Sequence, residues 1–136
     1  MAFMNSKLKK CSVVLLSVLF VAAGGNHFVS PDVYRKIMPD YLPYPLALVY
    51  VSGFFEILGG VAVAVPILRT VAGWGLIALL IAVFPANLNM VIHAEDFPAI
   101  PFWALVLRLP LQGLLIAWVW WTTIAKQSGD YQDGRS

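Results

Sequence analysis

Two ionisable side chains stand inside stretches of sequence that are otherwise apolar. Glu56 is the one acid and Arg108 the one base within these stretches. An ionisable group in lipid is costly, so such residues usually face a bundle interior or a water-filled cavity and often mark a functional site. A carboxylate and a guanidinium placed there could hydrogen-bond the oxygen atoms of a small ligand and relay protons.

Further polar residues lie in or at the ends of the apolar stretches, at a depth close to that of Glu56 and Arg108. Arg108 and Gln112 are spaced i, i+4 and therefore share a helix face. Asn89 and His93 have the same spacing. The candidate ligand-binding pocket predicted from the sequence consists of Glu56, Arg108, Gln112, Asn87, His93 and His27. Small residues flank Glu56 at helical spacing and would let another helix approach its carboxylate: Ser52, Gly53, Gly59 and Gly60.

Four apolar runs must position these residues. The chain of 136 residues is 60% hydrophobic and 12% charged, against about 25% charged residues in a soluble domain. Each run approaches the roughly 20 residues that an α-helix needs to cross a bilayer core of about 30 Å, and none has the alternation of a β-barrel strand. The predicted fold class is all-α: an integral membrane four-helix bundle. The runs are Cys11–Phe28, Leu46–Leu68, Val71–Ile92 and Phe102–Ile124.

Positive charge predicts the orientation of the bundle. With the N-terminus inside, six of the nine Lys and Arg residues fall in inner segments, which indicates that both termini are cytoplasmic. Arg108 then lies about 9 Å below the outer surface and Glu56 about 15 Å. The predicted pocket therefore occupies the outer half of the bundle.

Several local signals divide the chain further. Ser30 and Pro31 predict the start of a short interfacial helix between spans one and two, which Pro39 ends. Pro85 should kink span three. Residues 1–10 are expected to form a cytoplasmic N-terminal segment, 11–124 the membrane domain and 125–136 a disordered cytoplasmic tail. The first run also has the features of a cleavable signal peptide, but its apolar character continues to Phe28, which favours a retained helix.

The motifs around these residues resemble the DoxX-like family of small four-helix membrane proteins. They are Gly25-Asn26-His27-Phe28 followed by Pro31, Tyr34 and Ile37-Met38-Pro39, the Ser52-Gly53-x-x-Glu56-x-x-Gly59-Gly60 element, Phe84-Pro85-Ala86-Asn87 with His93, and Arg108-Leu109-Pro110-Leu111-Gln112. The resemblance extends from about His27 to Thr122. It implies a four-helix bundle in the cell membrane, with Glu56 and Arg108 among the family's characteristic polar positions. It also implies a link to quinone-dependent or thiol redox systems, and Cys11 as the single cysteine argues against the thiol branch.

Three functions are compatible with the sequence. The first is a non-catalytic accessory subunit of a quinone- or redox-linked membrane system, which needs a redox protein partner because the chain has no evident cofactor of its own. The second is a small proton-coupled transporter based on Glu56, usually a homo-oligomer. The third is an assembly or stress protein in which Glu56 and Arg108 form a structural ion pair.

Other classes of function have little support in the sequence. His27 and His93 could in principle hold a haem, but neither lies in a supporting motif. No metal-ligand spacing or nucleophile–base pair is present, and a net charge of +2 does not indicate nucleic acid. The expected partner is the lipid bilayer, and the chain is not expected to be an enzyme on its own.

Overall fold

The protein is an all-α membrane protein with four helical spans, as predicted. The computed structural model describes residues 2–125, with side chains from Lys7 onward. Four segments of the described chain are long and apolar enough to cross a membrane: Lys7–Val29, Pro45–Ala64, Arg69–Ile92 and Phe102–Thr123. The helices are α1 (Ala2–Val29), α2 (Pro31–Ile37), α3 (Pro45–Ala64), α4 (Arg69–Ala82), α5 (Phe84–Ile92), the 3-10 helix η1 (Ala94–Asp96) and α6 (Phe102–Thr123).

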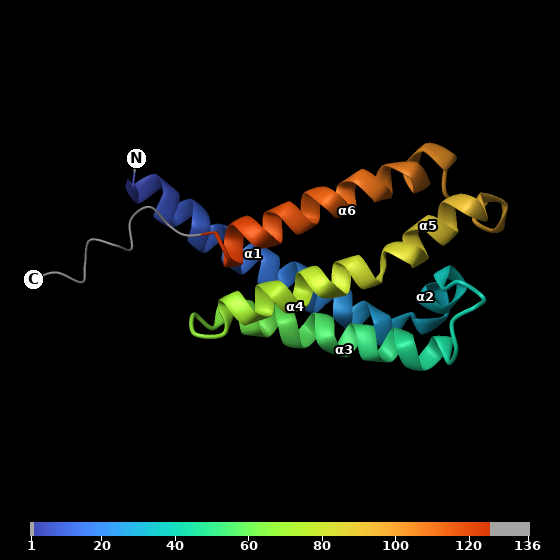
Figure 1. Cartoon of the computed structure of the whole chain (residues 1–136), viewed down its shortest axis with the longest axis horizontal. Helices are drawn as coiled ribbons and strands as arrows, with labels where there is room; N and C mark the ends of the chain where they lie inside the picture. Colours follow the sequence, from blue (N-terminus) through green and yellow to red (C-terminus); the bar gives the residue numbers. More distant parts are fainter. Residues whose placement is uncertain (1, 126–136) are drawn as a thin grey trace, which may run out of the picture.

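The spans run alternately in opposite directions and give the bundle two distinct ends (Figure 1). The terminal end holds the start of α1, the turn between α3 and α4, and the end of α6. The α2 end holds α2, η1 and the loops beside them. α1 packs most extensively on α3, while α6 packs mainly on α4 and α5.

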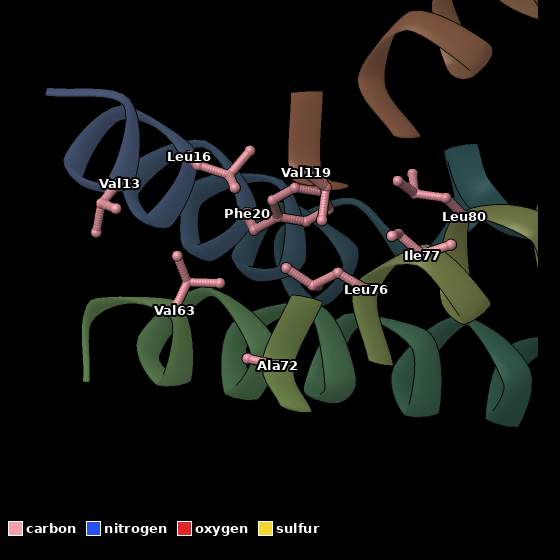
Figure 2. Close-up of a cluster of buried hydrophobic side chains, with 9 residues drawn as sticks. All are labelled: Val13, Leu16, Phe20, Val63, Ala72, Leu76, Ile77, Leu80 and Val119. Carbon is pink, nitrogen blue, oxygen red and sulfur yellow. The ribbon is translucent and has the colours of Figure 1, made fainter. Parts of the chain in front are cut away.

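The hydrophobic core lies toward the terminal end. Leu16 and Phe20 of α1 meet Val63 of α3, Leu76 of α4 and Val119 of α6 there (Figure 2). A polar contact joins α1 to α6 at the same level, where Ser12 Oγ lies 2.7 Å from Thr122 Oγ1 and accepts a hydrogen bond from Trp118 Nε1. The apolar core thus lies mainly on the terminal side of the polar residues of the predicted pocket, and Leu80 borders both.

Span three is interrupted, as Pro85 predicts. α4 ends at Ala82 and α5 begins at Phe84, with Val83 between them. Proline has no N–H, so it cannot continue the ladder of backbone hydrogen bonds. The ladder begins again at Val83 O, which accepts from the amides of Ala86 and Asn87 at 3.1 and 3.3 Å. Pro110 also lies in a span, but α6 continues through it without a break.

The short helix between the first two spans is present as α2. It begins at Pro31 and ends at Ile37, and Ser30 occupies the position before it without a side-chain capping bond. α1 begins at Ala2, so the segment 1–10 predicted to precede the first span is helical from residue 2. Apart from Ala125, the tail predicted to be disordered lies outside the described residues.

Candidate functional site

The six residues of the predicted pocket do not form one site. His27 and Glu56 meet between α1 and α3. Asn87, Arg108 and Gln112 line a separate cavity between α5 and α6. His93 is exposed at the end of α5.

The contact between His27 and Glu56 is buried. His27 Nε2 lies 3.1 Å from Glu56 Oε2, and their side chains are 10% and 15% exposed. The distance is that of an ion pair, but the geometry is not that of a hydrogen bond, and Oε2 has no hydrogen-bond partner of good geometry. The other ring nitrogen, His27 Nδ1, lies 3.0 Å from Val49 O. Both ring nitrogens of His27 are therefore engaged by α3.

Two glycines bring α1 and α3 close enough for this contact. A Cβ atom placed on Gly24 would lie 2.6 Å from Gly53 O, and one on Gly53 would lie 2.6 Å from His27 Cβ. Side chains larger than hydrogen would push the helices apart, as in other membrane helix pairs that rely on small residues. Of the glycines around Glu56, Gly53 and Gly60 face α1, whereas Gly59 faces Leu76 of α4.

Residues of α1 and α2 cover the His27 ring. Tyr34 of α2 stacks on it with 3.9 Å between ring centroids and an interplanar angle of 30°. Asn26 Nδ2 donates a 2.7 Å hydrogen bond to the Tyr34 hydroxyl. The interfacial helix therefore caps the buried pair at the α2 end.

The structural ion pair between Glu56 and Arg108, which belonged to the third of the open functions, is not formed, and Glu56 contacts His27 instead. α6, which carries Arg108, packs on α4 and α5 rather than beside the α1–α3 contact. His27 is level with Gly53, which is eight residues or about 12 Å into α3, because α1 ends well below the start of α3.

The second group of residues lines a cavity of about 240 Å³ where span three is interrupted. Gln112 is buried, Asn87 is half-buried and Arg108 is exposed. Asn87 Nδ2 donates to Gln112 Oε1 at 2.6 Å, and Gln112 Nε2 donates to Leu80 O. The remaining walls are apolar: Leu80, Val83, Leu111 and Leu115.

Arg108 and Gln112 differ in whether their hydrogen-bond donors are free to bind a ligand. α4 ends at Ala82, so no amide of this helix donates to the Leu80 carbonyl. Gln112 of α6 donates to it and so stabilises the interruption of span three. Arg108 forms no ion pair or hydrogen bond with another described residue. The guanidinium is therefore the free polar group of the cavity.

Asn89 and His93 have roles at the α2 end. Asn89 Nδ2 donates to Ile37 O at 3.0 Å and so joins α5 to α2. His93 Nδ1 lies 3.3 Å from Asn89 O, within its own turn of helix. Neither residue reaches the cavity or the His27–Glu56 contact.

Sequence reasoning missed Tyr34, Asn26 and the Val49 carbonyl as neighbours of the buried pair. In the sequence of the short helix, Tyr34 shares a face with Val33, Ile37 and Met38, and this apolar face is the signal that the helix has an inward side. The Val49 carbonyl carries no signal, because any residue supplies a backbone oxygen.

A larger hollow of about 560 Å³ lies between α3 and α4. Its walls are apolar, among them Phe55, Leu58, Val71 and Leu79, with the small residues Gly59 and Gly75. It has no polar group that could orient a ligand. Among the described residues, no three His, Cys, Asp or Glu side chains come together to hold a metal ion.

The fold and these sites define a multi-pass membrane protein of four helical spans with a buried His–Glu pair and an arginine-lined cavity. Residues 16–123 match the family described as "Domain of unknown function (DUF8561)", and the chain belongs to this family. No curated protein and no solved structure matches the chain.

Proposed function

We propose that the protein is a non-catalytic accessory subunit of a quinone-linked membrane system and binds a quinone headgroup at Arg108. The observation that carries this proposal is the free guanidinium in a small, mostly apolar cavity at the interruption of span three. The resemblance of its motifs to the DoxX-like family, in which some members are subunits of quinone-linked oxidoreductases, agrees with it.

The chemistry of the cavity suits a quinone. Quinone carbonyl oxygens accept hydrogen bonds, and Arg108 has donors that no described residue uses. A volume of about 240 Å³ is below the roughly 300–1,000 Å³ of sites that enclose a drug-sized ligand. It suits a single ring, with the apolar tail left among the lipid chains beside α6.

The proposed role is an accessory one because the described residues supply no electron carrier. A redox protein partner in the membrane would provide it. A second copy of the chain is a further candidate partner, and light scattering of the purified protein would determine whether it self-associates.

We place both termini in the cytoplasm on the basis of charge, and the protein in the cell membrane on the basis of its resemblance to the DoxX-like family. Among the described residues, Lys7, Lys9, Lys10 and Arg69 lie at the terminal end, against Arg35 and Lys36 at the α2 end. Basic residues favour the cytoplasmic side of a membrane protein. The Arg108 cavity would then open in the outer leaflet.

The test is binding of a short-chain quinone to the purified protein in detergent. We expect the quinone to raise the melting temperature of the wild type and of Arg35→Gln, a variant that removes an exposed charge outside the cavity. Arg108→Gln should melt normally without ligand and lose at least tenfold in affinity, because the guanidinium donors are gone. Arg108→Lys should retain part of the binding, since Lys keeps the charge but not the planar donor fork.

Two results would contradict the proposal. One is a wild type that quinone does not stabilise. The other is equal stabilisation of the wild type and Arg108→Gln, which would place the quinone elsewhere. If Arg108→Gln also folds poorly without ligand, the arginine has a structural role instead.

A further inference from the structure

We infer that His27 and Glu56 form a proton-binding site that holds one proton between Nε2 and Oε2 and exchanges it with water at the α2 end. This site is separate from the Arg108 cavity and does not depend on which ligand binds there.

The contact with the Val49 carbonyl determines the position of one proton on the His27 ring. Val49 O lies 3.0 Å from His27 Nδ1, and a carbonyl oxygen can only accept a hydrogen bond. Nδ1 must therefore carry a proton. A neutral ring in this tautomer has a bare lone pair on Nε2, which would face Glu56 Oε2 at 3.1 Å.

Counting protons between Nε2 and Oε2 leaves one favourable state. With no proton, a lone pair faces a carboxylate oxygen, and a negative charge is buried without compensation. With two protons, the positive imidazolium is left uncompensated. One proton gives a neutral site, as an imidazolium beside a carboxylate or an imidazole beside a carboxylic acid. In either form the couple is a single-proton carrier.

No other charge among the described residues balances the pair. α1 contributes Asn26 beside the site, α2 contributes the Tyr34 ring, and α3 contributes the Val49 carbonyl and Gly53. All of these groups are neutral in the contacts they make. The charged residues of α2 are exposed: Asp32, Arg35 and Lys36.

The position of the site gives the proton a short path to water. His27 is two residues from the end of α1, and its side chain retains 10% exposure. Above it lies Tyr34, whose hydroxyl is held by the exposed Asn26. Tilting of this one ring would open the imidazole to the aqueous phase, so Tyr34 is the cover of the site.

The first experiment observes the proton by NMR of the full-length protein labelled with ¹⁵N at histidine. The chain has two histidines, so His93→Gln assigns the His27 signals. We expect Nδ1 to be protonated and one further proton to be present on the Nε2–Oε2 couple at neutral pH. In Glu56→Gln, which keeps the side-chain shape, that proton should disappear and Nε2 should become an unprotonated, pyridine-type nitrogen.

The spectrum of the wild type is decisive even if Glu56→Gln folds poorly. A free pyridine-type Nε2 without a shared proton in the folded wild type would overturn the inference. Identical His27 signals in the wild type and a folded Glu56→Gln would overturn it as well.

The second experiment measures exchange of this proton in deuterated water. Tyr34→Phe keeps the stacked ring but loses the hydrogen bond from Asn26, so we expect exchange several-fold faster than in the wild type. Tyr41→Phe, an exposed tyrosine outside the site, should exchange as the wild type does. A proton that does not exchange over days in the wild type would contradict an aqueous path, and an unchanged rate in Tyr34→Phe would contradict the role of Tyr34 as a cover.

Discussion

At the scale of single residues, adjacent glycines in α1 have opposite surroundings. Gly24 faces α3, where an added Cβ would meet Gly53 O at 2.6 Å and Ile57 Cγ1 at 2.8 Å. Gly25, the next residue, would have no such atom within 4 Å of its Cβ. The pair separates the effect of a methyl group on helix packing from its effect on helix propensity.

We expect Gly24→Ala to destabilise the protein and Gly25→Ala to leave it unchanged or slightly more stable. Inserting a methyl group against backbone costs about 1–3 kcal/mol, and widening the α1–α3 contact should also separate His27 from Glu56. Alanine at an open helical site gains up to about 1 kcal/mol over glycine. Melting temperatures of both variants in the same detergent provide the measurement. Equal melting temperatures would mean that α1 and α3 are not as close as described.

At the scale of elements, the interruption of span three and the side chain of Gln112 depend on each other. Pro85 prevents a continuous helix, the Leu80 carbonyl is left free by the helix, and Gln112 donates to it from α6. In a membrane the carbonyl has no water to replace that donor. Pro85 in α5 therefore explains why the side-chain amide of Gln112 is buried in α6.

A double-mutant cycle tests this coupling. Gln112→Leu should lower stability by about 1 kcal/mol, because Leu80 O loses its donor. In a Pro85→Ala background the cost should be smaller, since a continuous helix can supply the Phe84 amide to the same carbonyl. Reversible unfolding in mixed detergents gives the four free energies. Additive effects would show that the interruption and Gln112 are independent.

At the scale of the whole molecule, charge and topology lead to one orientation. Both the start of α1 and the end of α6 lie at the terminal end (Figure 1). The sides can be distinguished with single cysteines in a Cys11→Ser background, labelled on whole cells by a membrane-impermeant maleimide.

We expect Asp40→Cys and Glu95→Cys, at the α2 end, to be labelled on intact cells. Ile67→Cys, in the α3–α4 turn, should be labelled only after the cells are permeabilised, because the basic terminal end is placed in the cytoplasm. All three positions are exposed in the structure. The reverse pattern of labelling would invert the proposed orientation and place the Arg108 cavity in the inner leaflet.

The spans, α2 and the interruption at Pro85 could be predicted from the sequence because they depend on local properties. Apolar length, a proline at a helix start and a proline within a helix act over a few residues. The partner of Glu56 could not be predicted in this way. It depends on which helices are neighbours and on how far α1 slides along α3, and neither is encoded by residue spacing within one span.

The gathering of polar residues in one half of the bundle was visible in the sequence, but their division into two sites was not. Depth along a helix follows from counting residues, whereas the face of each helix that meets a neighbour follows from packing. Asn89 shows the difference, since its side chain joins α5 to Ile37 of α2 and contributes to neither site.

The closeness of α1 to α3 has a consequence for how the chain is made. Every side chain and carbonyl of the His27–Glu56 contact, its glycines and its Tyr34 cover precedes residue 57 in the sequence. Once α3 has entered the bilayer, all of these groups are therefore in the membrane, and the two spans can dock before α4 is inserted. The later spans would then be added to a hairpin that is already assembled, with α6 joining last at the terminal end.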